Sequence, residues 1–173
     1  MKLFPYIKKN NIKVLINKRN FLDVILSQHK HRYNDIKSHY SQNDKELKMV
    51  RNITVELNPD TIISMISHYE QMHNYTIEQL KKNNIKYLNI TYETLSEKKQ
   101  MDWIKIIKFL DPLININKKY KKKVMDIVNK DEIKKTTVKK HYDTISNYDE
   151  IFNTLKGTIY EKYIDKKTTI INL

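Results

Sequence analysis

The pattern of apolar and polar residues predicts a strand that leads directly into a helix near the start of the chain. Apolar side chains cluster between Ile12 and Ile16, as in a parallel strand that is covered on both faces. Asn20 is a good helix N-cap, and Asp23 places a carboxylate in the first turn, where it complements the positive end of the helix dipole. The apolar run over residues 21–26 predicts that the first two helical turns are buried against a sheet.

The same kind of pattern predicts two more helices and a second strand. Asn58 and Pro59 form a strong helix start, and the pair 83–84 marks the end of that helix. Alternating apolar residues predict a strand over 85–92, and a helix over about 96–110 follows it. Trp103 is expected to anchor this last helix to the sheet. The long helix carries an apolar stripe that we expect to be core: Ile62, Ile63, Ile66, Tyr69, Met72, His73, Ile77 and Leu80.

Length and composition indicate one folded domain over residues 1–173. Apolar residues make up 39% of the chain and charged residues 31%, which is typical of a globular protein. Cysteine is absent from the sequence, so disulfides and thiolate metal sites are excluded. The sequence has no apolar run of membrane-spanning length and no signal-peptide core at its start. We therefore expect a cytoplasmic protein with no membrane partner.

Charge and histidine content suggest candidate partners, but neither decides the function. The formal net charge of +13 would ordinarily indicate a nucleic-acid partner. Lys, Asn, Ile and Tyr are abundant together, and because A/T-rich codons encode all four, part of this charge can reflect gene composition. The densest basic cluster is Lys118–Lys123, for which a solvated helix face is expected. His29, His31 and His39 lack the spacing of a recognised zinc motif, so we predict no metal site.

Arg19 and Ser27 are candidate ligands for a phosphate group. Arg19 follows the predicted first strand, at the edge of an α/β sheet where ligands usually bind, and Ser27 lies two turns along the next helix. A guanidinium fork suits phosphate oxygens, and a hydroxyl can add a hydrogen bond to the same group. The structural alternative is a solvated or salt-bridged arginine and a serine that bonds within its own helical turn. Position alone leaves both interpretations open.

The order of residues in this segment resembles a known binding motif. Arg19-Asn20-x-x-Asp23-x-x-x-Ser27 is similar to the 3′-phosphate-binding segment of sulfotransferases that use 3′-phosphoadenosine 5′-phosphosulfate. The resemblance implies that Arg19 and Ser27 hold the 3′-phosphate of this donor, whose product is adenosine 3′,5′-bisphosphate. The run from Lys18 to Asp23 looks closest to the carbohydrate-directed bacterial and viral branch, which implies a hydroxyl acceptor, most simply on a sugar.

Two softer motifs follow in the order that the same family has. Tyr92-Glu93-x-Leu95 after a strand resembles the family segment whose tyrosine borders adenine, which makes Tyr92 the candidate base contact. The run over 145–150, followed by a Gly157-Thr158 turn, resembles the carboxyl-terminal segment of the branch. In relatives a basic stretch just upstream of this tail folds over the nucleotide. The residues of that stretch here are Lys134, Lys135, Lys139 and Lys140.

Two parts of the family pattern are missing from this sequence. No glycine precedes Gly157, so there is no 5′-phosphosulfate loop, and the usual catalytic base would fall before Met1. The chain therefore resembles the carboxyl-terminal part of a sulfotransferase, and we assign it no catalytic residue. A separately encoded amino-terminal part, a truncated remnant and nucleotide binding without catalysis all remain open.

The resulting fold prediction is α/β: a reduced P-loop nucleotide-kinase-like parallel sheet in which helices dominate. A sheet so reduced would expose an edge and an apolar face near Val14 and Leu88, which favours a homodimer or a separately encoded partner. The alternative function is a non-catalytic basic binding module for nucleic acid or another polyanion.

Overall fold

The computed structural model of the chain describes residues 3–33, 52–97, 100–129 and 140–167. The chain divides into two compact units. We call Met1–Arg19 with Gln71–Glu132 the sheet unit, and Asn20–Glu70 with Ile133–Leu173 the helical unit. Helix α4 (Pro59–Lys82) contributes its first half to the helical unit and its second half to the sheet unit. The single domain expected over residues 1–173 stays a prediction.

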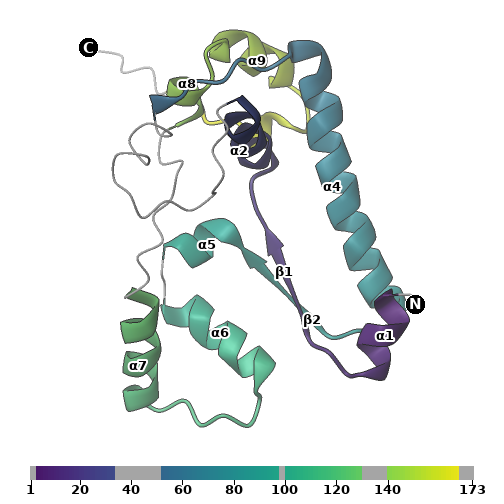
Figure 1. Cartoon of the computed structure of the whole chain (residues 1–173), viewed down its shortest axis with the longest axis vertical. Helices are drawn as coiled ribbons and strands as arrows, with labels where there is room; N and C mark the ends of the chain where they lie inside the picture. Colours follow the sequence, from purple (N-terminus) through teal and green to yellow (C-terminus); the bar gives the residue numbers. More distant parts are fainter. Residues whose placement is uncertain (1–2, 34–51, 98–99, 130–139, 168–173) are drawn as a thin grey trace. The chain divides into compact units, whose positions relative to one another are not determined.

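The sheet unit is built on two parallel strands, β1 (Val14–Lys18) and β2 (Tyr87–Thr91) (Figure 1). Lys18 lies opposite Thr91 at the carboxyl ends of the pair. Each strand overlaps the range predicted from the sequence, and their parallel pairing agrees with the predicted sheet type. Because parallel strands cannot be joined by a hairpin, the chain passes through helices between them.

The expectation that the first strand is covered on both faces is wrong. Along β1 the side chains alternate between half-buried and exposed, and Leu15 remains 36% exposed. Among the described residues the sheet has two strands, so each of them is an edge strand. A sheet this narrow does not support a helical layer on both faces, so one set of side chains stays in contact with solvent.

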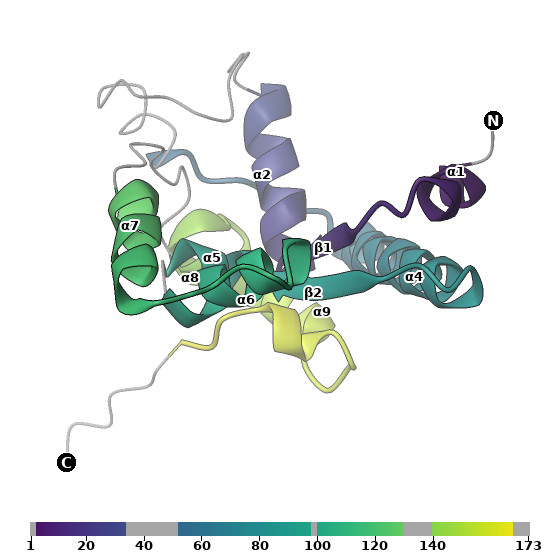
Figure 2. The same cartoon turned by 90° about the horizontal axis from the view of Figure 1, so that it is seen from below.

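Besides the second half of α4, the described part of the sheet unit contains one helix before β1 and three helices after β2. They are α1 (Leu3–Lys9), α5 (Tyr92–Ser96), α6 (Gln100–Leu110) and α7 (Lys118–Asn129). Helix α1 forms where only a basic lead-in was expected, and the helix predicted over about 96–110 corresponds to α6, with α5 preceding it as a separate short helix. Helix α6 packs against β2 and α7, as Figure 1 and Figure 2 show. Ile104 and Ile106 of this helix are buried.

Helix α2 (Phe21–Tyr33) opens the helical unit and begins as the sequence predicts. The side-chain oxygen of Asn20 accepts the backbone N–H of Leu22 at 3.0 Å, which confirms the N-cap. The first two turns are buried, but the prediction that they pack against a sheet is wrong. They pack in a helical core made of Phe21, Leu22, Ile25, Leu26, Val55, Leu57, Ile62, Ile66, Ile145, Tyr148, Ile151, Leu155, Tyr163 and Ile164.

The start and end of α4 also follow the sequence prediction. The Asn58 side chain accepts the backbone N–H of Asp60 at 2.9 Å, and Asn84 adopts a left-handed φ of 53° just after the helix. Ile66 and Leu80 of the predicted stripe are buried. Met72 is 53% exposed and is not core, contrary to the prediction. It lies just beyond the point where α4 passes from the helical unit to the sheet unit.

The carboxyl-terminal part of the helical unit contains α8 (His141–Thr144), α9 (Tyr148–Leu155) and the 3₁₀ helix η1 (Glu161–Tyr163). Just before α9, Ile145 forms an isolated parallel bridge with Val55. Gly157 follows α9 with a φ of 74°, which confirms the left-handed residue expected there. The chain is thus mixed α/β with helices dominating and a small parallel sheet. None of the described helices is long and apolar enough to cross a membrane.

Candidate functional site at the ends of the two strands

Arg19 and Tyr92 occupy equivalent positions, each immediately after its strand. Because Lys18 lies opposite Thr91 in the parallel register, the two strands end at the same edge of the sheet. The guanidinium carbon of Arg19 lies 4.6 Å from the centroid of the Tyr92 ring, which is a cation–π contact. The structure therefore brings together two of the residues that the family resemblance assigns to nucleotide binding.

The start of α5 fixes the position of Tyr92. Thr91 is the N-cap of this helix, and its hydroxyl oxygen accepts the backbone N–H of Thr94 at 3.2 Å. The hydroxyl of Thr94 donates in turn to the carbonyl oxygen of Thr91 at 2.9 Å. Tyr92 is consequently the first residue of a capped helical turn rather than the last residue of the strand predicted over 85–92.

The hydrogen-bonding state of Arg19 is unusual for a buried donor. Its side chain is half-buried, and its Nε is a buried nitrogen with no hydrogen-bond partner in the part of the chain that the structure describes. Buried donors normally have partners, because an unpaired one costs about 1–3 kcal/mol. The indole Nε1 of Trp103 in α6 is in the same state. The two unpaired donors both belong to the sheet unit.

Trp103 was predicted as a packing residue, and the sequence pattern did not predict that its indole N–H would lack a partner among the described residues. The ring belongs to the helix that packs on β2. Which atoms of a tryptophan find acceptors depends on the tertiary neighbours of the ring, so the apolar periodicity of α6 could not have indicated it.

Ser27, the predicted partner of Arg19, is a half-buried residue of α2. It belongs to the helical unit, whereas Arg19 belongs to the sheet unit. The binding of one phosphate by both side chains therefore stays a prediction.

The four predicted tail lysines divide into two groups. Lys134, Lys135 and Lys139 lie outside the described residues. The Nζ of Lys140 lies 3.5 Å from a carboxylate oxygen of Asp165, and the lysine side chain is 62% exposed. Lys140 therefore has an ion-pair partner in the helical unit, and its contact with a nucleotide stays a prediction.

His141 is a buried polar residue that sequence analysis did not single out. Its Nε2 lies 3.0 Å from a carboxylate oxygen of Asp23, and its Nδ1 accepts the backbone N–H of Asp165 at 2.9 Å. Because Nδ1 accepts, the neutral ring carries its proton on Nε2 and donates it to Asp23. Both ring nitrogens are engaged, so we assign this histidine a structural role. Its neighbours in the sequence are polar, and they gave no indication of its burial.

The described ranges contain no group of three or more His, Cys, Asp or Glu side chains placed to hold a metal ion. Comparison with known proteins adds no assignment: no family model, no curated protein and no solved structure matches the chain.

Proposed function

We propose that this chain is a sulfotransferase-family protein that binds 3′-phosphoadenosine 5′-phosphosulfate at the carboxyl edge of β1 and β2. In this proposal Arg19 binds the 3′-phosphate, Ser27 adds a hydrogen bond to it, and Tyr92 contacts the adenine. The observation that carries the proposal is the contact of Arg19 with Tyr92 at the edge of a parallel sheet where ligands usually bind.

The cation–π contact would prepare Arg19 for an anion. An arginine that stacks on an aromatic ring keeps its N–H groups in the plane of the guanidinium, where they are free to meet phosphate oxygens. The ring restricts the side chain before the ligand arrives, which lowers the entropy cost of binding.

The same contact restricts where the adenine can bind. Arg19 covers one face of the Tyr92 ring, so a base in contact with this tyrosine would use the opposite face or the ring edge. The bound nucleotide would supply the sulfuryl group, and a carbohydrate hydroxyl is the proposed acceptor. We assign no described residue as the base that would take the proton of that hydroxyl, so we expect nucleotide binding to be easier to detect in the isolated chain than sulfuryl transfer.

Calorimetric titration with adenosine 3′,5′-bisphosphate tests this proposal, with adenosine 5′-monophosphate as the matched ligand that lacks the 3′-phosphate. Arg19→Ala should weaken the bisphosphate at least tenfold, because a hydrogen bond to a charged group contributes about 1.5–3 kcal/mol. The same variant should leave the affinity for the monophosphate unchanged. Arg19→Lys keeps the charge without the fork, so it should recover only part of the loss.

Two results of this titration would overturn the proposal. The first is the absence of bisphosphate binding to the unmodified chain. The second is an equal loss of affinity for both ligands in Arg19→Ala, since that would mean that Arg19 does not recognise the 3′-phosphate.

Ser27→Ala, which removes one hydroxyl, should lower the affinity for the bisphosphate alone, by about two- to tenfold.

The second candidate function is a non-catalytic basic binding module for a polyanion. The observation that favours it is the helix α7, which presents a dense set of lysines. In this case Arg19→Ala would lower polyanion binding only slightly, and a steep dependence on salt would remain.

A further inference from the structure

The net positive charge of the chain is concentrated in the sheet unit. This unit contains 19 lysines and arginines against 8 aspartates and glutamates, a net charge of +11. The helical unit contains 14 against 12, a net charge of +2. Codon composition acts on the whole gene and does not by itself place the charge in one unit, so the asymmetry indicates a function for the basic residues of the sheet unit.

Four lysines of α7 differ in their partners from four lysines of the helical unit. In the helical unit, Lys140, Lys162, Lys166 and Lys167 each lie within 4.0 Å of a carboxylate. In α7, Lys118, Lys119, Lys121 and Lys122 form no ion pair with another residue in the described part of the chain. Their charges are therefore available to a ligand.

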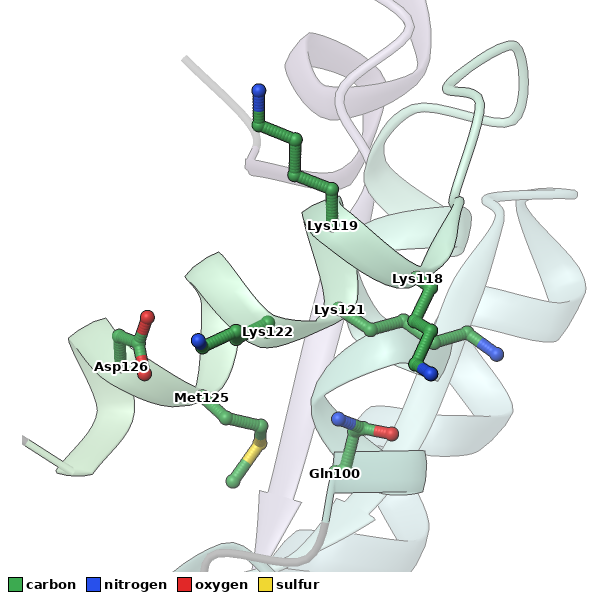
Figure 3. A pocket seen from close by; sticks show the side chains of 7 residues that line it. All are labelled: Gln100, Lys118, Lys119, Lys121, Lys122, Met125 and Asp126. Atoms are coloured by element: carbon green, nitrogen blue, oxygen red, sulfur yellow. The ribbon is translucent and has the colours of Figure 1, made fainter.

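These four lysines line an open depression on the surface. The cavity has a volume of about 760 Å³, and its other lining residues are Gln100, Met125 and Asp126. Figure 3 shows that Lys118 and Lys121 extend toward the side of α7 where Gln100 lies, whereas Lys119 and Lys122 point in other directions. The buried Val124 anchors α7 through its apolar face, which leaves the lysine face open.

The lining chemistry indicates the class of ligand. Lysine ammonium groups act as point charges, which suits phosphate and sulfate oxygens without a fixed geometry. None of the described residues that line the cavity is aromatic or an arginine, so these residues do not offer the stacking that single-stranded nucleic acids use. Its volume lies within the range of small-molecule sites, about 300–1,000 Å³.

We propose that this cavity binds a compact anion that carries several phosphate or sulfate groups. Ammonium groups of Lys118 and Lys121 contact its oxygens, and the side chain of Met125 contacts its apolar part. Gln100 of α6 offers a neutral amide to the same ligand. This site is independent of the proposed nucleotide site, because it uses neither Arg19 nor Tyr92.

Titration calorimetry of the full chain with tripolyphosphate tests the phosphate form of the ligand, and titration with sucrose octasulfate tests the sulfate form. The double variant Lys118→Gln/Lys121→Gln removes two ammonium groups that line the cavity and should weaken binding of the preferred probe at least tenfold. The matched control is Lys8→Gln/Lys9→Gln in α1, which removes the same charge from two exposed residues of the same unit. It should weaken binding less than twofold.

Four outcomes would overturn this proposal. The first three are no binding of either probe, an equal loss in the α1 and α7 variants, and a clear preference for a single-stranded oligonucleotide over both probes. The first outcome would show that the cavity binds neither kind of anion. The second would show that binding depends only on the net charge of the chain. The third would show that the ligand is a nucleic acid and not a compact anion. A loss caused by Arg19→Ala but not by the α7 variant would place the probe at the nucleotide site instead.

Discussion

His141 and Asp23, which are 118 residues apart in the sequence, are joined by a hydrogen bond of 3.0 Å. The histidine is buried, whereas the aspartate side chain is 28% exposed in the first turn of α2. Through its other ring nitrogen the histidine accepts the backbone N–H of Asp165. One imidazole thus connects the start of α2 to the end of the described chain.

Removal of this imidazole should destabilise the helical unit. His141→Ala leaves the backbone N–H of Asp165 and the carboxylate of Asp23 without their partner, so we expect the free energy of unfolding in urea to fall by about 1–3 kcal/mol. Asp23→Asn keeps an acceptor oxygen and should cost about 1 kcal/mol or less. Equal losses in the two variants would contradict the assigned donor and acceptor roles.

Asn147 belongs to the tail motif, and the structure gives it a specific backbone contact. Its side-chain oxygen accepts the N–H of Leu57 at 3.1 Å, and its side-chain nitrogen donates to the carbonyl of Leu57 at 2.7 Å. Asn147→Ala should lower the free energy of unfolding by about 1–3 kcal/mol, because both backbone groups lose their partner. Asn153→Ala, on the exposed side of α9, should stay within about 0.5 kcal/mol in the same urea titration. A loss as small as that of the control would mean that water replaces the amide.

The Arg19–Tyr92 contact should be measurable as a coupling energy in the absence of ligand. A double-mutant cycle with Arg19→Met and Tyr92→Leu should give about 0.5–1 kcal/mol in chemical denaturation, the usual contribution of a partly exposed cation–π pair. Tyr92→Phe keeps the ring and therefore most of the contact, so a second cycle that uses Tyr92→Phe should give a much smaller coupling energy. If the two cycles gave the same coupling energy, the ring face would not be the attractive element.

Stability at high pH should depend on Tyr163. Burial of this phenol, together with its hydrogen bond to Glu70, holds its pKa well above the usual value of 10.0. Above pH 10 the unfolded chain releases a proton that the folded chain keeps, so the unfolded state is favoured as the pH rises. The free energy of unfolding should therefore fall as the pH is raised from 9 to 11, and it should fall less steeply in Tyr163→Phe. Parallel pH profiles for the two proteins would contradict this shift.

The sequence by itself determined the local structure where a residue type has a local physical effect. Asn20 and Asn58 cap their helices because a short side-chain amide reaches the free N–H groups of the first turn. Gly157 occupies a left-handed position because it has no Cβ. The two strands and their parallel pairing were also predictable, since apolar runs separated by helical segments favour a parallel sheet.

The tertiary structure decided which faces are buried and which distant residues meet. The first turns of α2 are apolar whatever they pack against, and only the fold shows a helical core where a sheet was expected. Likewise, the register of β1 and β2 brings Arg19 onto Tyr92, and the burial of His141 comes from Asp23 and Asp165, which are far away in the sequence. Local propensity reaches only a few residues along a chain, whereas contacts between distant segments depend on how the whole chain excludes water from its core.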